Sequence, residues 1–178
     1  GMIYVMIADG FEEIEALEPV DIMRRAGLSV QTVGVSGRSV RGAHGITVEA
    51  DIGFDEVKPE LTEVIVLPGG PGHELLDASN EVHYMINSAH ARGAYIAAIC
   101  AAPSVIGKKG LLDGKHAVCF PGYEKYLYGA EISDAKVCVD GKFITARGAG
   151  AAAEFGFAIV RALCGDDAAK KLSEAMQY

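Results

Sequence analysis

Strand-length apolar runs alternate with helical segments along the first two thirds of the chain. Residues 2–8 form a continuous apolar run, residues 12–26 space apolar side chains at helical intervals, and residues 28–35 are again β-rich. The same order recurs downstream as a run, a helical segment and a second run, at 63–67, 81–92 and 94–99. Because strands joined by helices usually pair in parallel, this order predicts an α/β fold whose mostly parallel sheet is covered on both faces.

The remaining segments are shorter and less regular. A Gly-rich passage from 34 to 53 predicts short strands or a hairpin, and Asp140-Gly141 between two β-rich segments predicts a second hairpin. Near the C-terminus, apolar residues at helical spacing over 154–164 predict a helix. Asp166 is then expected to cap a final helix.

Length and charge limit the class of protein. The 178 residues are 50% hydrophobic, and we expect a single domain over residues 2–178, with Gly1 a remnant of an expression tag. The formal charge is −8, and Lys and Arg never cluster beyond pairs, so we expect neither nucleic acid nor an anionic membrane as a partner. Residues 94–106 are too short to span a bilayer, and residues 2–8 lack the basic start of a signal peptide. We therefore expect a cytoplasmic protein.

The cysteines and histidines lack the spacing of a metal site. The four cysteines are scattered and form no C-x-x-C pair, which is typical of free thiols in a reducing compartment. The five histidines form no compact ligand pair, so we expect no metal. No dinucleotide or phosphate-loop motif follows any strand, and we expect no cofactor.

Three segments follow predicted strands at points where a site can form. They are "DGFEEIE" from Asp9 to Glu15, "PGGPG" from Pro68 to Gly72, and Cys100. Ligands of open parallel sheets bind outside the carboxyl ends of the strands, because loops and helix N-termini converge there. The topology therefore predicts that these segments share one edge of the sheet.

Cys100 has two interpretations. Free cysteine is often a buried packing residue, and we interpret the other three cysteines in that way. At a strand-to-helix turn, however, unpaired N–H groups stabilise a thiolate and lower the pKa of the thiol, which makes it a nucleophile. The small residues Ala101 and Ala102 permit close approach of a ligand, and Pro103 is suited to start the helix.

Each of the other candidate site residues also has two interpretations. Glutamates at 12, 13, 15 and 18 suit a helix N-terminus through its dipole, and one of them could instead face Cys100 as a protonated hydrogen-bond donor. Gly69 and Gly70 could form an oxyanion hole or only a tight turn. His44 and His73 could reach the edge of the site, although surface histidines are common.

Five segments together resemble the ThiJ/PfpI superfamily, in particular the branch of the parkinsonism-associated protein deglycase and its bacterial relatives. The segments occur in the family's order over nearly the whole chain: "ADGFEEIEALEPVDIMRRAG" (8–27), "GAHGITVEAD" (42–51), "VLPGGPG" (66–72), "AAICAAPSVI" (97–106) and "TARGAGAAAEFGFAIVRAL" (145–163). The resemblance implies a flavodoxin-like, class I glutamine amidotransferase-like three-layer sandwich that forms a homodimer.

The resemblance also implies roles for individual residues. Cys100 matches the nucleophile on a strained elbow, and Glu15 matches the glutamate that hydrogen-bonds its sulfur. The anion-binding N–H groups match Gly69, Gly70 and Ala101. At the site periphery the resemblance places further residues: Arg147 and Gly148.

Two departures bear on the reaction. Ala101 stands where the peptidase branch has histidine, and Phe120 stands where some deglycase-like members have one. We therefore expect a cysteine enzyme of the deglycase or glyoxalase type, acting without a cofactor on a small aldehyde or dicarbonyl such as methylglyoxal. The alternatives are a redox-sensing stress protein or chaperone that uses oxidation of Cys100, and, third, an intracellular amidase or peptidase.

Overall fold

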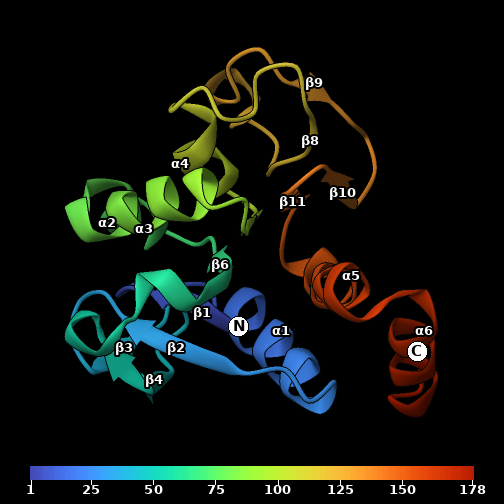
Figure 1. The fold of residues 1–178 in the computed structure, drawn as a ribbon. Coiled ribbons are helices and arrows are strands. Elements are labelled where there is room, and N and C mark those ends of the chain that lie inside the picture. Colours follow the sequence, from blue (N-terminus) through green and yellow to red (C-terminus); the bar gives the residue numbers. More distant parts are fainter.

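A seven-stranded sheet forms the centre of the computed structural model, which describes residues 1–178 (Figure 1). Only its edge strand β10 is antiparallel to its neighbour, and the other pairs are parallel, which confirms the predicted sheet. The strands in spatial order are β10 (Val137–Asp140), β11 (Phe143–Ala146), β7 (Tyr95–Ile99), β6 (Thr62–Leu67), β1 (Met2–Ile7), β2 (Val30–Gly34) and β5 (Ile52–Gly53).

Helices cover both faces of the sheet and complete a three-layer α/β sandwich, as predicted. One hydrophobic cluster packs against a face covered by α1 (Glu13–Arg25), α5 (Ala152–Cys164) and α6 (Asp166–Ala175). The second cluster lies on the opposite face, under α2 (His73–Ala78), α3 (Asn80–Ala91) and α4 (Pro103–Gly107). Figure 1 shows α1 and α5 on the opposite side of the sheet from α3.

Strand β1 shows why the central runs are continuously apolar. Ile3 and Val5 belong to the cluster under α1 and α5, whereas Tyr4 and Met6 belong to the cluster under α3. Successive side chains of a strand point to opposite faces, and here both faces are buried. A sheet covered on only one side would instead require polar residues at alternate positions.

Two further pairs of short strands lie outside the main sheet. β3 (Ser39–Arg41) and β4 (Thr47–Glu49) form the hairpin expected in the Gly-rich passage. β8 (His116–Ala117) and β9 (Glu131–Ile132) form a small parallel pair. The four short 3-10 helices have the bounds Phe54–Glu56, Pro59–Leu61, Glu124–Tyr126 and Ala149–Ala151.

Two local predictions were wrong. Asp166 does not cap the last helix, because Gly165 occupies the cap position and Asp166 is already the first helical residue. Cys164 is not a packing residue, since it is exposed at the end of α5. Cys119 is buried, as expected, and Cys138 is half-buried.

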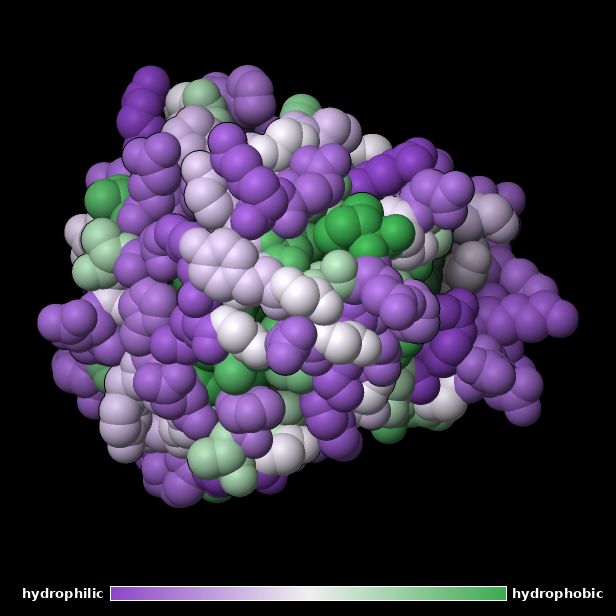
Figure 2. Space-filling model, turned by 90° about the horizontal axis from the view of Figure 1, so that it is seen from above, coloured by the Kyte–Doolittle hydropathy of each residue, from purple (hydrophilic) through white to green (hydrophobic).

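The surface is predominantly hydrophilic. Seen from above in Figure 2, it is mostly purple, and hydrophobic side chains are visible only in small groups. No helix combines the length and the apolar character that crossing a bilayer requires.

Candidate active site

Four neighbouring strands deliver the predicted site residues to one edge of the sheet. Cys100 follows β7, Gly69 and Gly70 follow β6, Glu15 lies in the helix after β1, and Arg147 follows β11. These strands are adjacent in the order β11-β7-β6-β1, and they run parallel. The shared edge predicted from the topology is therefore present, and it is the setting in which open parallel sheets bind ligands.

The backbone at Cys100 adopts a conformation that non-glycine residues seldom occupy. Its φ angle is 66°, in the left-handed region. Two main-chain hydrogen bonds hold this turn: the N–H of Cys100 donates to Ala146 at 2.8 Å, and its carbonyl accepts from Phe120 at 2.8 Å. Strain of this kind persists where the surroundings impose it, and it concentrates at functional sites. The turn places a half-buried thiol between β7 and α4.

Glu15 is the glutamate of α1 that faces Cys100. Its side chain is buried, its Oε1 accepts the N–H of Gly69 at 3.0 Å, and its carboxyl group lies close enough to the Cys100 thiol for each group to shift the pKa of the other. Burial, with a smaller contribution from the negative charge of Glu12, raises the pKa of Glu15 to about 7. Glu15 therefore holds or releases its proton near neutral pH, as a group that moves protons must.

The thiol of Cys100 departs from the sequence-based expectation. Burial and the adjacent Glu15 carboxylate raise its pKa to about 12, whereas the helix-start argument predicted a lowered value. The backbone N–H groups of Ala101 and Gly70 do lower the pKa, but less than burial raises it. Helix α4 has only five residues, so its dipole contributes little. Between these two pKa values the pair carries one negative charge, and a thiolate forms when the proton resides on Glu15.

Gly70 and Ala101 provide the N–H groups that face the sulfur. Both lower the pKa of the Cys100 thiol, and neither donates to a main-chain oxygen. Gly70 has a φ of +83°, which a residue with a side chain would adopt only with strain. Gly69 differs from the predicted assignment, because its N–H binds the Glu15 carboxyl group. The N–H groups of Gly70 and Ala101 are thus the ones left free beside the sulfur, whereas that of Gly69 holds Glu15.

Gly69→Ala is expected to disrupt the pair directly. A Cβ at this position would lie 2.5 Å from Glu15 Oε1, 2.6 Å from Cys100 Cβ and 2.9 Å from the Ile99 carbonyl oxygen. We expect a loss of stability on the order of 1–3 kcal/mol in urea unfolding, as for overpacked cores. We also expect a changed rate of Cys100 alkylation by iodoacetamide, measured by mass spectrometry.

Gly150→Ala is the matched control, because a Cβ at Gly150 would meet no atom within 4 Å. Equal stability and equal alkylation rates for the two variants would show that the Gly69 backbone does not support the pair.

Glu15→Gln is expected to stabilise the protein in a pH-dependent way. A carboxyl group with a pKa of about 7 when folded and 4.5 when unfolded retains its proton in the folded state across that interval. Stability therefore falls as pH rises from the unfolded value through the folded one. The variant lacks this titration. Relative to wild type, it should gain about 2 kcal/mol in urea unfolding between about pH 5.5 and about pH 8.5. A stability difference that does not change with pH would show that Glu15 is not desolvated.

The other predicted residues lie around the pair without bonding to the thiol. Arg147 is exposed and Gly148 half-buried beyond β11, and Phe120 is 42% exposed beside the Cys100 backbone. The Nδ1 of His73 lies 2.9 Å from the Gly70 carbonyl oxygen, and its ring packs edge-on against Tyr123. Neither His73 nor His44 is hydrogen-bonded to Cys100, since their ring nitrogens contact the Gly70 carbonyl oxygen and the Glu13 carboxylate.

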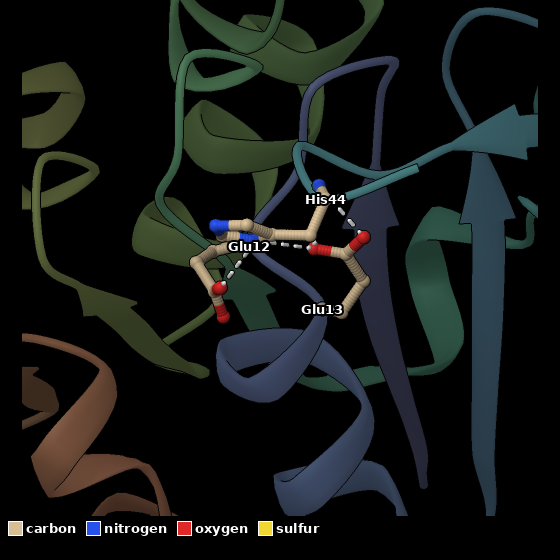
Figure 3. Close-up of side chains that lie close together, drawn as sticks. All are labelled: Glu12, Glu13 and His44. Atoms are coloured by element: carbon tan, nitrogen blue, oxygen red, sulfur yellow. Dashed lines mark hydrogen bonds and ion pairs between the residues drawn. The ribbon is translucent and has the colours of Figure 1, made fainter. Parts of the chain in front are cut away.

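Sequence reasoning missed one cluster beside the site, made by Glu12, Glu13 and His44 (Figure 3). Potential ligand atoms of these three residues lie within 4.8 Å of one another. The carboxylate oxygens are engaged, however: both oxygens of Glu13 accept the N–H of His44, and Oε2 of Glu12 caps the first turn of α1. We assign no metal to this cluster. No sequence spacing signals it, because His44 follows Glu13 by 31 positions.

Known proteins similar to this chain include plant, animal and archaeal relatives. It is 33% identical over 176 residues to protein dj-1beta of Drosophila melanogaster, covering 97% of this chain and 94% of that protein. Protein DJ-1 homolog B of Arabidopsis thaliana is 35% identical over 175 residues, 96% of this chain, which spans only 40% of that relative's length. A protein named deglycase from Pyrococcus abyssi is 29% identical over 147 residues, 82% of this chain and 89% of that protein.

The comparison with solved structures agrees with the sequence comparison. Oxidized DJ-1 of Toxoplasma gondii superposes with a TM-score of 0.95 at 34% identity, covering 99% of this chain and 98% of that one. The sequence model described as the DJ-1/PfpI family matches residues 2–162. The strained cysteine turn, the buried glutamate and these matches together show that the chain belongs to the DJ-1/PfpI family.

Proposed function

We propose that the chain is a cysteine-dependent enzyme of the deglycase or glyoxalase type that acts on methylglyoxal-like dicarbonyls or their adducts and protects against carbonyl stress. The pairing of Cys100, on its strained turn, with the buried carboxyl group of Glu15 carries this proposal. It joins a sulfur nucleophile to a carboxyl group with a pKa of about 7. Family relatives named deglycase support the same class of reaction.

The first step is addition of the sulfur to the aldehyde. The thiol proton passes to the Glu15 carboxylate, and the sulfur forms a bond to the aldehyde carbon of methylglyoxal. The carbonyl electron pair moves to oxygen, where the N–H groups of Gly70 and Ala101 are placed to stabilise the negative charge. Glu15 then gives its proton to this oxygen, which leaves a hemithioacetal on Cys100 and a carboxylate beside it.

The second step moves a proton between the two substrate carbons. The Glu15 carboxylate removes the hydrogen from the former aldehyde carbon as a proton, and the electron pair forms a carbon–carbon double bond while the ketone oxygen takes up a proton to give an enediol. Glu15 then returns its proton to the former ketone carbon while the hydroxyl on the sulfur-bearing carbon loses its proton and becomes the thioester carbonyl, which leaves a lactoyl thioester. Water hydrolyses the thioester and releases lactate and the free thiol. The net reaction adds one water to methylglyoxal, with no net oxidation, so it requires no redox partner.

Amidase or peptidase chemistry receives less support. Such a reaction needs a base paired with the nucleophile that also protonates a departing amine, and histidine commonly fills that role. Ala101 follows the cysteine here, and His44 and His73 bond to other groups. We therefore do not adopt it.

The proposal is tested by incubating the fully reduced protein with methylglyoxal in the absence of glutathione and measuring lactate. Lactate above the buffer blank, in proportion to protein concentration, is the expected result. No lactate from protein shown by intact mass to be unoxidised at Cys100 would overturn the enzyme assignment.

A second candidate is a redox-sensing stress protein that uses oxidation of Cys100. Two observations favour it: Cys100 is half-buried and so partly accessible, and a similar solved structure is that of an oxidized DJ-1. A protonated Glu15 could donate a hydrogen bond to a Cys100 sulfinate. Peroxide titration followed by peptide mass spectrometry should then place the first sulfinate on Cys100 before exposed Cys164. Preferential oxidation of Cys164 would contradict this role.

We also propose that the chain forms a homodimer in a reducing cytoplasm. The four cysteines are unpaired, which suits such a compartment. Light scattering after gel filtration is expected to give twice the chain mass of 18.7 kDa. A mass of one chain at micromolar concentration would contradict the dimer.

A further inference from the structure

The side chain and the main chain of Glu12 both support Glu15. Its Oε2 accepts the N–H of Ile14 at 2.7 Å and that of Glu15 at 3.2 Å, so it caps the first turn of α1. Its own N–H donates to the Gly69 carbonyl oxygen at 3.0 Å, and the N–H of Gly69 donates to Glu15 Oε1. A closed set of contacts therefore joins Glu12, Gly69 and Glu15.

His44 lies against the outer side of Glu12. Its Nδ1 is 3.1 Å from Glu12 Oε1 and 3.1 Å from Glu13 Oε1, and Figure 3 shows the imidazole between the two carboxylates. The histidine side chain is 70% exposed, whereas that of Glu12 is 14% exposed and that of Glu13 is 7% exposed. Solvent protons therefore reach these three residues through the exposed imidazole of His44.

Glu13 anchors the loop that carries His44. Its carboxylate accepts the N–H of His44 at 2.9 Å and that of Ile46 at 3.2 Å. Although burial opposes it, these hydrogen bonds lower the pKa of Glu13, so that this carboxylate stays charged. The bonds and charge of Glu13, together with the charge of Glu12, raise the pKa of His44. The imidazole therefore gains a proton more readily than an isolated histidine does.

We propose that Glu12 and His44 are positioning residues for Glu15. The Glu12 side chain fixes the turn that carries Glu15. Protonated His44 offsets the negative charge of Glu12, and the charge that remains governs how readily Glu15 gives up its proton. The proposal deepens the proposed function, and it rests on the role of Glu15 as the group that moves protons. Through His44, the β3–β4 hairpin loop thus affects the reaction, although neither Glu12 nor His44 touches the substrate.

The sign of each effect follows from the charges around Glu15. Glu12 contributes a negative charge that disfavours ionisation of Glu15, and protonated His44 offsets that charge. The other charged or titratable groups on the packed elements are Cys100 after β7, Glu13 on α1 and Arg41 on the hairpin, whose guanidinium lies near Gly45.

Two further groups lie after neighbouring strands. His73 after β6 bonds to the Gly70 carbonyl oxygen, and Arg147 after β11 forms no ion pair. Removing Glu12 should therefore ease ionisation of Glu15, and removing His44 should hinder it.

Glu12→Gln and His44→Gln test the proposal, because each keeps a hydrogen-bonding group while removing a charge. The rate of Cys100 alkylation by iodoacetamide, followed by peptide mass spectrometry across pH, reports when the Cys100–Glu15 pair first ionises. Glu12→Gln should move the midpoint to lower pH by on the order of half a unit, and His44→Gln should move it to higher pH by a similar amount. The acid limb of lactate formation should move with it.

The surface pair of His116 and Glu131, 2.7 Å apart on β8 and β9, supplies matched controls. Glu131→Gln and His116→Gln should leave both profiles unchanged. Shifts of the same sign for Glu12→Gln and His44→Gln, or a lower Tm with unmoved midpoints, would overturn the proposal and reduce Glu12 to a helix cap. If wild type makes no lactate while the alkylation midpoints move in opposite directions, the proposed function fails, and only the control of Glu15 ionisation by Glu12 and His44 stands.

Discussion

Replacing Cys100 with serine is expected to reduce lactate formation from methylglyoxal by at least about 10³-fold, the scale on which nucleophile removal acts in covalent catalysis. A serine hydroxyl is less acidic and less nucleophilic than the thiol, and Glu15 could not ionise it at neutral pH. Serine fits the same half-buried turn, so the fold should be retained. The measurement is lactate yield over time with purified, fully reduced protein.

Cys164→Ser provides the matched control for this variant. Cys164 is exposed at the end of α5 and touches no part of the site, so its replacement should leave turnover unchanged. Retained turnover in Cys100→Ser would show that Cys100 is not the nucleophile. Equal losses in both variants would point instead to general damage by the substitutions.

Glu15→Gln should reduce turnover by about 10²- to 10⁴-fold, the range that a positioned acid–base group contributes, while leaving Cys100 open to alkylation. The amide keeps an oxygen for the N–H of Gly69 and a donor for the sulfur, but it cannot carry a proton between substrate carbons. It also removes the carboxylate charge that, after burial, most raises the pKa of Cys100. This variant should therefore lose turnover while its Cys100 thiol still reacts with iodoacetamide.

Glu18→Gln is the control for this separation. Glu18 lies one turn further along α1 and accepts the hydroxyl of Tyr178, away from Cys100. It should leave both turnover and alkylation as in wild type. If Glu15→Gln abolished alkylation as well as turnover, Glu15 would be needed to expose or orient the thiol, and the assignment of proton transfer would lose its support.

The fold was largely predictable because the core strands are buried on both faces. Residues 2–8 and 94–99 are continuous apolar runs for that reason, and the helical spacing of 12–26 and 81–92 leaves little choice but a parallel α/β sheet. Helix α2 was missed, since its six residues, His73–Ala78, are too few to establish a period. Asp166 was misplaced by one position, because Gly165 takes the cap and Asp166 begins the helix.

The site was predictable only in part. The strand-to-helix turn at Cys100 is signalled locally by small residues and Pro103, but the choice of Glu15 among four glutamates required the family resemblance. The direction in which the pKa of Cys100 shifts depends on burial and on the Glu15 carboxylate, 85 positions away in the sequence. An argument from the local helix start omits both. The contact of His44 with Glu12 depends on the hairpin loop returning to α1, and no spacing in the sequence encodes that return.

In the proposed mechanism, Cys100 binds the aldehyde and Glu15 moves the proton that completes the reaction. These two roles are separated by methylglyoxal labelled with carbon-13 at the aldehyde, followed by NMR on wild type and Glu15→Gln. We expect the label to become lactate carboxylate with wild type, to remain a protein-bound hemithioacetal with Glu15→Gln, and to form no adduct with Cys100→Ser. Lactate formation by Glu15→Gln at the wild-type rate, or no bound carbon in any protein containing Cys100, would contradict this mechanism.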